Sequence, residues 1–445
     1  TAQSKSSLHG GGHAVGAQSA GEQQGFVQTQ TLTPNDGPID FGRGSVAVSG
    51  STALIGTRWN ENVYTAETGP GSVYVYENTD TEWEQQTVLQ SPSAASSDAF
   101  GWSVAIDGDT AVVGAEWAEN AERVYVFERN GNEWSEQAEL TPADGAMGLF
   151  GDTVAISGET VLVGCRNDNP HGPLSGSAYI FTRDGTSWSQ QAKLVANDGD
   201  AEDLFGWGIG ISNDTAVVGA RGHTNQNGNT TGAAYVYERT ADTWGLKTKL
   251  IPDDGISGEE FGEAVAVAGD VILVGARRDR AVPNTSNRTG SAYVFEKTEG
   301  TWAQETKLTP QRDGDLMADT LAVTENTALV ESNNSSNAFV YTRYDDGWER
   351  SQTLNLTQDS SIESLALGNG TALLRTGNDS QVGAVGTHVF ERRRGDAFET
   401  QSGNRTNTST DNRNEISIFE RFAGTETLPL AVAGGVLSSI ALGVY

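Results

Sequence analysis

The sequence predicts an all-β protein, a seven-bladed β-propeller with four-stranded antiparallel blades, joined to a C-terminal hydrophobic (transmembrane) helix. Three recurring phrases carry this prediction. The first opens with Phe-Gly and ends in Val-Gly-Ala or a close relative, the second is similar to Ser-Ala-Tyr-Val-Phe-Glu, and the third opens with Trp. Each set contains four short alternating or β-branched runs joined by Gly, Asn and Asp turns, which is typical of a four-stranded sheet. Units of about 50 residues with four strands each are the signature of propeller blades around a channel.

Five copies of the pattern are clear and two are weaker. The clear copies open with Phe41, Phe100, Phe150, Phe205 and Phe261. In the weaker copies, MADTLAVTENTALVES and IESLALGNGTALLRT, Glu331 and Arg375 stand where the other copies have the Gly of Gly-Ala. The Asp-Gly, Ser-Gly and Asn-Asp pairs between the first two runs suit tight two-residue hairpins. The Trp residues that open the fourth runs keep a regular register, so we expect them to pack between blades: Trp83, Trp134, Trp188, Trp244, Trp302 and Trp348.

An extra copy of the fourth run precedes the first blade. Residues 26–37 read FVQTQTLTPNDG, which matches a fourth run and its exit turn. We expect residues 26–33 to form the outer strand of the last blade, because this pairing closes the ring and removes an open sheet edge. The predicted organisation is a flexible Gly-, Ser- and Gln-rich tail at 1–25, the propeller at 26–400, a polar linker at 401–427 and a membrane-anchor helix at 428–445.

The last segment, LPLAVAGGVLSSIALGVY, carries no charge. As a helix it would be about 27 Å long, enough to cross the core of a bilayer. The alternative is a buried strand or helix added to the propeller. A stripe of small residues lets membrane helices approach closely, so the segment also predicts a homo-oligomer or a pairing with another membrane helix. The stripe consists of Ala431, Gly435, Ser439 and Gly443.

The charge of the chain excludes one class of partner. Lys and Arg total 28 and Asp and Glu total 59, which gives a formal net charge of −31. Such a chain repels phosphate backbones, so nucleic-acid binding is not expected. The excess of carboxylates with few lysines is typical of proteins from extreme halophiles, whereas the abundant Gly, Trp, Tyr and Phe indicate a folded β protein rather than a disordered one.

The Phe-Gly openings and Val-Gly-Ala ends resemble the FG-GAP repeat of the integrin α-subunit propeller. The resemblance covers roughly residues 26–400 and implies a seven-bladed propeller that serves as an extracellular binding platform. Blades of the integrin type often carry a calcium-binding D-x-D-x-D-G-x-x-D loop between strands one and two. Here the corresponding hairpins, such as Asp107 to Thr110, are too short to wrap the ion, so the calcium sites of the family are not expected.

One face of the predicted disc carries candidate ligand-binding residues. A basic residue follows the Gly-Ala pair in four blades, and forked guanidiniums could grip carboxylates or sulfates of an acidic glycan. These residues are Arg58, Arg166, Arg221 and Arg277, and blade two has Glu116 instead. The alternative is a repeated structural salt bridge to the acids just before each Phe-Gly, namely Asp40, Asp98, Asp203 and Glu260. The loops of the same face also carry aromatic and His side chains of the kind that sugar and protein binding use, Trp59, Tyr64, Trp117 and His223.

One connection is a candidate calcium site. The sequence NDGDAED offers hard oxygen ligands at alternate positions, Asp198, Asp200, Glu202 and Asp203. The alternative is that such clusters arise by chance in so acidic a chain. Apart from this Ca²⁺ candidate, the sequence indicates no cofactor.

Catalytic signatures are scarce. The chain contains no H-E-x-x-H, no G-x-S-x-G elbow and no phosphate loop, and Cys165 takes the place of a small packed Ala. Paired carboxylates for glycoside chemistry stay open because acids are so numerous. Many N-x-S/T sequons favour an exported, glycan-bearing protein: Asn213, Asn229, Asn284, Asn287, Asn333, Asn334, Asn355, Asn369, Asn378, Asn404 and Asn407.

Together these observations predict a non-catalytic, exported surface propeller, anchored at its C-terminus on the extracellular face of a cell or on a virion envelope. It would bind a glycan or protein partner through its loop-rich face, as an adhesin or a spike of a membrane-containing virus does. Two alternatives remain open from the sequence. One is a hydrolase or lyase that acts on polysaccharide, and the other is a structural subunit of a surface assembly.

Overall fold

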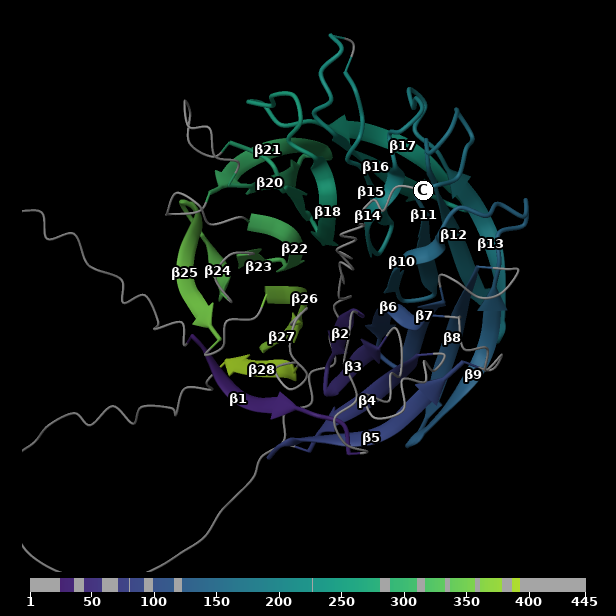
Figure 1. Cartoon of the computed structure of the whole chain (residues 1–445), viewed down its shortest axis with the longest axis vertical. Coiled ribbons are helices and arrows are strands. Elements are labelled where there is room, and N and C mark those ends of the chain that lie inside the picture. The colour runs from purple at the N-terminus through teal and green to yellow at the C-terminus, as the bar shows by residue number, and fades with distance from the viewer. Residues whose placement is uncertain are drawn as a thin grey trace, which may run out of the picture.

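The structure is a computed structural model. It describes residues 25–35, 44–57, 71–79, 81–91, 99–115, 122–225, 227–280, 289–309, 317–332, 337–356, 361–377 and 386–392. These residues form seven four-stranded antiparallel sheets, arranged as blades around a centre (Figure 1). The predicted all-β propeller is therefore confirmed. The predicted tail, the linker and the hydrophobic segment 428–445 lie outside the described residues.

Six blades follow one another in chain order, each with its first strand at the centre and its fourth at the rim. Blades one to three are β2 (Val46–Ser49), β3 (Thr52–Thr57), β4 (Ser72–Asn78), β5 (Trp83–Gln90); β6 (Phe100–Asp107), β7 (Thr110–Ala115), β8 (Arg123–Asn130), β9 (Glu133–Leu140); and β10 (Phe150–Ser157), β11 (Thr160–Cys165), β12 (Ser177–Asp184), β13 (Ser187–Leu194). Blades four to six are β14 (Phe205–Ser212), β15 (Thr215–Ala220), β16 (Ala233–Thr240), β17 (Thr243–Leu250); β18 (Phe261–Ala268), β19 (Val271–Ala276), β20 (Ser291–Thr298), β21 (Thr301–Leu308); and β22 (Met317–Thr324), β23 (Thr327–Ser332), β24 (Asn337–Tyr344), β25 (Gly347–Asn355).

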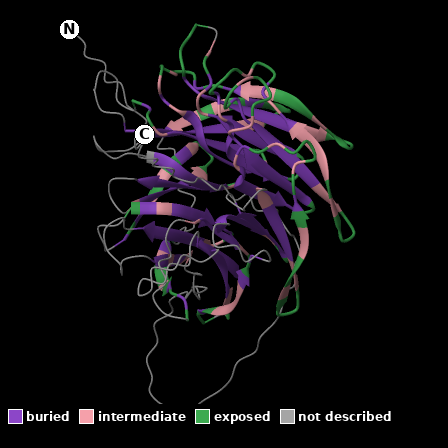
Figure 2. Ribbon diagram, turned by 45° about the vertical axis from the view of Figure 1, so that its right-hand side comes forward, coloured by how far each residue is buried: buried purple, intermediate pink, exposed green. Residues whose placement is uncertain are grey.

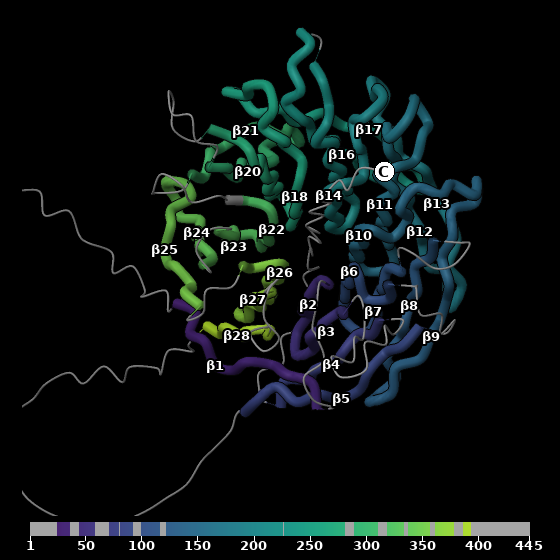
Figure 3. The backbone as a smooth tube through the Cα atoms, viewed as in Figure 1, coloured from purple at the N-terminus to yellow at the C-terminus, as the bar shows by residue number. Residues whose placement is uncertain are grey.

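The seventh blade joins the two ends of the propeller. It contains β26 (Ser361–Leu367), β27 (Thr371–Gly377) and β28 (Gly386–Arg392), and its outer strand is β1 (Phe26–Leu32). Phe26 of β1 pairs with Arg392 of β28, and Leu32 pairs with Thr387. This is the place expected for the extra fourth run, and the tube in Figure 3 shows β1 running beside β28. The inner strands β2 and β26 also pack together, so the ring is closed.

The core lies between the blades. Inner and middle strands are buried along almost their whole length, whereas the fourth strands are partly exposed at the rim (Figure 2). The Phe that opens each of blades two to five is fully buried and packs against the Tyr of its third strand. In blades three to five the two rings meet edge to face, as Phe261 and Tyr293 do with ring centroids 5.4 Å apart. The fourth-strand indoles reach the preceding blade, as Trp188 does by donating to the side-chain oxygen of Gln137 at 2.6 Å.

Two small residues meet at each regular blade interface. We call the residue after the opening Phe the first-strand glycine, and the Gly near the end of the second strand the second-strand glycine. A Cβ on the second-strand glycine Gly219 would lie 2.0 Å from the carbonyl oxygen of the first-strand glycine Gly262 in the next blade. Gly262 also has a φ of 91°, which L side chains rarely adopt. The two positions are therefore glycine because the backbones of neighbouring blades touch there.

The described residues contain strands and turns but no helix. Among them, no segment qualifies as a helix able to span a bilayer.

Candidate binding surfaces

The two faces of the disc differ in their connections. One face carries the short hairpins, such as the two-residue turn between β6 and β7. We call it the tight-turn face. The other carries the links between the second and third strands of each blade and the links from one blade to the next, and we call it the loop-rich face. Loops of this face support one another, since the backbone N–H of Leu204 donates to the carbonyl oxygen of Leu174 at 3.0 Å.

The predicted arginine ring lies at the channel edge of the loop-rich face, and its described members are ion-paired. Nε of Arg166 lies 2.5 Å from Oδ2 of Asp152. Nη1 of Arg221 lies 2.8 Å from Oε2 of Glu263, and Nε of Arg277 lies 2.9 Å from Oδ1 of Asp319. The acids are the residues two positions after the start of each first strand. Because the last two pairs join neighbouring blades, these arginines also connect one blade to the next.

The ring also contains a cation–π stack. The guanidinium carbons of Arg166 and Arg221 lie 4.0 and 3.3 Å from the ring centroid of Trp207. The indole of Trp102 donates to Oδ1 of Asp152 at 2.9 Å. Arg166 is only 6% exposed. These arginines are therefore already bound to carboxylates and an aromatic ring. This arrangement is a structural salt bridge, as the alternative interpretation of the sequence expected, but its acids differ from the ones that were expected.

The acids expected as salt-bridge partners are used elsewhere or lie outside the described residues. Asp203 contacts His223, and Glu260 contacts Arg278, with 3.0 Å between Oε1 and Nη1. The remaining predicted residues of this face lie outside the described residues, namely Asp40, Arg58, Trp59, Tyr64, Asp98, Glu116 and Trp117.

A second repeated cluster joins a Lys, a Tyr and two acids in blades three and five. In blade three, Nζ of Lys193 lies 2.6 Å from Asp144 and 2.7 Å from Asp168, and the Tyr179 hydroxyl donates to Asp144 at 3.1 Å. Burial raises the pKa of Asp168, but the hydrogen bonds from Lys193 and Ser177 outweigh it and lower the pKa overall. Blade five repeats the arrangement, with Lys307 between Asp254 and Asp279. The sequence reasoning missed this cluster, although aligning the blades would have revealed it.

His223 takes the place of the second acid in blade four. Its Nδ1 lies 3.0 Å from Oδ2 of Asp203, and its Nε2 lies 3.2 Å from Nζ of Lys249. His223 is buried. It was predicted to be an exposed ligand contact, and the structure places it inside a charged cluster instead.

The four predicted calcium ligands do not come together. Asp198 faces Lys249 at 2.6 Å, and Asp203 holds His223 and also accepts the backbone N–H of Asp200 at 3.0 Å. Glu202 is exposed on the turn. Throughout the described part of the chain, no three His, Cys, Asp or Glu side chains gather as a metal-ligand set. Asp198 and Asp203 therefore contact Lys249 and His223 and are not directed at a common point.

Known proteins place the repeat in a family. The sequence model described as "FG-GAP repeat" matches residues 26–76, 83–127, 134–181, 188–237 and 244–295, which together cover more than half of the chain. The chain belongs to the FG-GAP repeat family. Each matched segment begins at the fourth strand of one blade and ends in the third strand of the next. The FG-GAP repeat therefore crosses a blade interface, where the paired glycines lie.

Solved structures agree with the FG-GAP propeller fold. One matching chain comes from a crystal structure of a mitotic checkpoint complex. It is 11% identical, with a TM-score of 0.51, and the match covers 88% of this chain and 98% of that chain. At this identity the likeness concerns the fold alone. No curated protein matches the sequence.

Two potentially reactive groups of these FG-GAP blades, Cys165 and Glu259, are buried. Burial raises the pKa of the Cys165 thiol, whose Sγ donates to the carbonyl oxygen of Gly148 at 3.4 Å. Burial is also the main reason, with the charge of Asp279 adding to it, that the pKa of Glu259 rises to about 8. A carboxyl group with such a pKa could act as a general acid, but Glu259 is only 1% exposed.

Exposed apolar side chains concentrate on the loop-rich face of this FG-GAP propeller. Met147 is 64% exposed and Ile251 is 52% exposed, and both lie on connections between blades. Leu174 and Ile256 are also exposed on loops of this face. The sequence reasoning missed these aliphatic residues because it looked for aromatic side chains.

Four of the predicted sequon residues lie in the described part of the chain, and all four are exposed: Asn213, Asn229, Asn355 and Asn369. The others lie outside it: Asn284, Asn287, Asn333, Asn334, Asn378, Asn404 and Asn407.

Proposed function

We propose that this FG-GAP propeller is a non-catalytic surface module that binds a partner through its loop-rich face. The observation that carries the proposal is the group of exposed aliphatic residues on that face, Met147, Leu174, Ile251 and Ile256. Exposed apolar side chains on rigidly supported loops are typical of protein–protein contact surfaces. A protein partner is therefore the first candidate.

A glycan is the second candidate partner. Trp59, Tyr64 and Trp117 belong to the same face by strand order and are side chains on which sugars stack. Among the described residues, the arginines proposed to hold an acidic glycan have carboxylate partners of their own. The glycan proposal therefore depends on the aromatic loops rather than on Arg166, Arg221 and Arg277.

The test compares matched variants of the full chain. Met147→Ser combined with Ile256→Ser should weaken binding to whole cells of the source organism about a hundredfold or more, because each buried aliphatic side chain contributes about 1.5–3 kcal/mol. Tyr344→Ser, an exposed change at the tight-turn face, is the control and should bind normally. Equal binding by all three proteins would refute the proposed surface.

The same assay addresses the enzyme alternative. Purified surface polysaccharide is incubated with the protein, and the soluble products are analysed. A binding module leaves the polymer intact, whereas a hydrolase or lyase releases fragments. If fragments appear and Glu259→Gln abolishes them, the buried carboxyl group of blade five is part of an active site.

We further propose that the protein is exported, membrane-anchored through residues 428–445 and adapted to high salt. The support is the charge of −31, the four exposed sequon residues and the uncharged C-terminal segment. Dialysis into dilute buffer should unfold the protein, because carboxylate repulsion is screened only when the Debye length falls to about 3 Å near 1 M salt.

Replacing Gly435 and Gly443 by Leu should preserve membrane insertion and abolish self-association. Unchanged cross-linking of that variant would refute the packing role of the small-residue stripe.

A further inference from the structure

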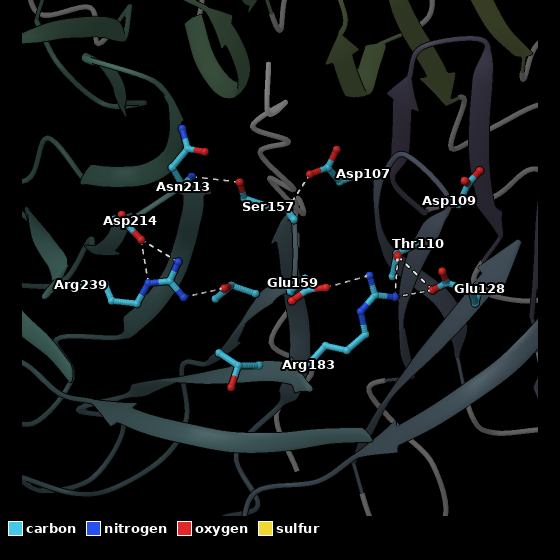
Figure 4. A pocket seen from close by; sticks show the side chains of 13 residues that line it. Asp107, Asp109, Thr110, Glu128, Ser157, Glu159, Arg183, Asn213, Asp214 and Arg239 are labelled. Carbon is cyan, nitrogen blue, oxygen red and sulfur yellow. Dashed lines mark hydrogen bonds and ion pairs between the residues drawn. The ribbon is translucent and has the colours of Figure 1, made fainter. Parts of the chain in front are cut away.

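A polar pocket of about 720 Å³ lies on the tight-turn face, across blades two, three and four. Figure 4 shows Arg183 and Arg239 on either side of Glu159, with Asp107, Ser157 and Asn213 along the inner edge. Its lining residues come from the hairpins between first and second strands and from the third strands. Because this is the face opposite the loops, the pocket is separate from the proposed binding surface.

The pocket interrupts a contact that repeats from blade to blade. Near the end of the third strand, a basic residue reaches back to a Glu on the third strand of the preceding blade. Arg183 contacts Glu128 at 2.7 Å, Lys297 contacts Glu238 at 3.1 Å, and Arg129 and Arg343 contact Glu77 and Glu296. In Arg129 and Arg183, Nη1 also donates to a Thr on the preceding blade's second strand. We call this contact the third-strand latch.

Blade three lacks the acid of the latch. Thr182 occupies the Glu position, since it pairs with Thr160 as Glu128 pairs with Thr110. Nη1 of Arg239 therefore keeps only the Thr contact, to Oγ1 of Thr160 at 3.3 Å. Its other nitrogens contact Asp214 at 2.6 and 2.7 Å. Among the described residues, no carboxylate takes the place of the missing Glu, and Thr182 itself lines the pocket.

We propose that this pocket binds a carboxylate-bearing sugar of the uronic acid class. Its carboxylate would occupy the position of the missing latch Glu, where Nη1 of Arg239 and the hydroxyls of Thr160 and Thr182 can donate to it. Arginine is suited to this role because its planar fork matches a carboxylate. A short Thr at the Glu position leaves the space that the ligand fills.

The remaining wall selects a hydroxylated ligand over a simple anion. Five carboxylates of the described residues line the same pocket, so a small anion without hydrogen-bond donors meets repulsion. They are Asp107, Asp109, Glu128, Glu159 and Asp214. Sugar hydroxyls can instead donate to these carboxylates and exchange hydrogen bonds with Ser157 and Asn213. Burial raises the pKa of Asp107, although the hydrogen bond from the backbone N–H of Gly158 lowers it in part.

The test measures binding of sodium glucuronate to the full chain by calorimetry, with glucose and sodium acetate as controls. Wild-type protein should bind glucuronate and neither control. Thr182→Glu restores the latch, and it should weaken glucuronate binding about tenfold or more, because the new carboxylate competes for a charge-assisted hydrogen bond. The same substitution should leave the melting temperature unchanged or raise it.

Two further variants keep the proposal falsifiable if Thr182→Glu fails to fold. Arg239→Gln should weaken binding, whereas the matched change Arg129→Gln, at a complete latch, should not. Equal affinity for glucuronate and acetate, or unchanged affinity in Arg239→Gln, would overturn the proposal. Because Met147 and Ile256 lie on the opposite face, their Ser variants should bind glucuronate normally. Failure of the loop-rich surface and failure of this pocket are therefore distinguishable.

Discussion

The five interfaces from blade one to blade six differ from the two that flank blade seven. In the first group a second-strand glycine lies against the backbone of the next blade, and Gly56, Gly114, Gly164 and Gly275 behave as Gly219 does. In the second group the same position holds Glu331 or Arg375, and both side chains are 0% exposed. At the first group of interfaces, glycine has no side chain and the backbones of neighbouring blades come into contact. At the second group, a charged side chain is buried between the blades.

The difference shows what the FG-GAP motif does physically. Where glycine is lost, the buried charge needs polar partners from neighbouring strands. The backbone N–H of Thr320 donates to Oε2 of Glu331 at 3.1 Å. Nη1 of Arg375 donates to the carbonyl oxygens of Gly44, at 2.8 Å, and of Gly56 in blade one. The two interfaces that flank blade seven are therefore stabilised by specific buried hydrogen bonds, and they occur where the ring closes.

The largest effect is expected from breaking the closure itself. Deletion of residues 1–34 removes β1 and the buried side chains of Phe26 and Leu32. We expect a loss of about 5 kcal/mol or more in the free energy of unfolding, since two large apolar groups and a strand ladder disappear. Deletion of residues 1–24, which spares β1, is the matched control. Equal denaturation midpoints of the two truncations would contradict the closing role of β1.

The next effect concerns a regular interface. Gly219→Ala should destabilise the protein by about 3 kcal/mol, because the new Cβ would lie 2.0 Å from the carbonyl oxygen of Gly262 and the blades must separate. Gly245→Ala on the outer strand β17 is the control, since a Cβ there meets nothing within 4 Å. Chemical denaturation of both variants measures the difference. A stable Gly219→Ala protein would show that the interface tolerates a wider spacing.

An irregular interface should respond to loss of its charge. Arg375→Met should cost about 2–3 kcal/mol, because the carbonyl oxygens of Gly44 and Gly56 lose buried donors. Arg123→Met removes a surface pair with Glu139, whose 3.3 Å contact is partly exposed, and should cost less than about 1 kcal/mol. Similar costs for the two changes would mean that Arg375 is no more than a space-filling residue.

The smallest effect depends on pH. Burial, together with the charge of Asp319, raises the pKa of Glu331 well above its ordinary value of 4.5. Its contribution to stability is therefore fully present below about pH 4.5 and decreases as pH rises through the higher folded-state pKa. Glu331→Gln should match the wild type near pH 4.5 and be more stable by about 1 kcal/mol at pH 8. The exposed change Glu136→Gln serves as the control, and parallel pH profiles for all three proteins would rule out this role.

Much of the propeller could be predicted because each blade repeats the same short sequence motifs. The phrase from Phe-Gly to Val-Gly-Ala marks the first two strands of a blade, and the Tyr-Val-Phe-Glu and Trp phrases mark the third and fourth. The extra FVQTQTL run indicates the closing strand. Side-chain partners were harder to predict. In blades two to five the residue before the opening Phe, such as Leu149 or Glu260, has a positive φ that turns the chain at that point. The acid two positions after the Phe, such as Asp152, then meets the arginine at the channel edge.

Functional detail was lost where the reasoning treated repeats as equal. The second phrase ends in Glu in four clear blades but in Thr182 in blade three, and Thr182 lines the polar pocket. Likewise, His223 aligns with Asp168 and Asp279, which contact lysines, so its burial could have been expected. Exceptions to a repeat indicate special sites more clearly than its common residues do.

The pairing of β1 with β28 also sets an order of events during synthesis. Phe26 contacts Gln352, 326 positions further along the chain, and pairs with a strand made later still. Blades one to six can each fold as they leave the ribosome, since their strands are adjacent in sequence. The first strand must wait unpaired until the seventh blade emerges, because contacts between distant segments form slowly. We therefore expect ring closure to be the last step of folding, and a chain interrupted before β28 leaves β1 without the strand it pairs with.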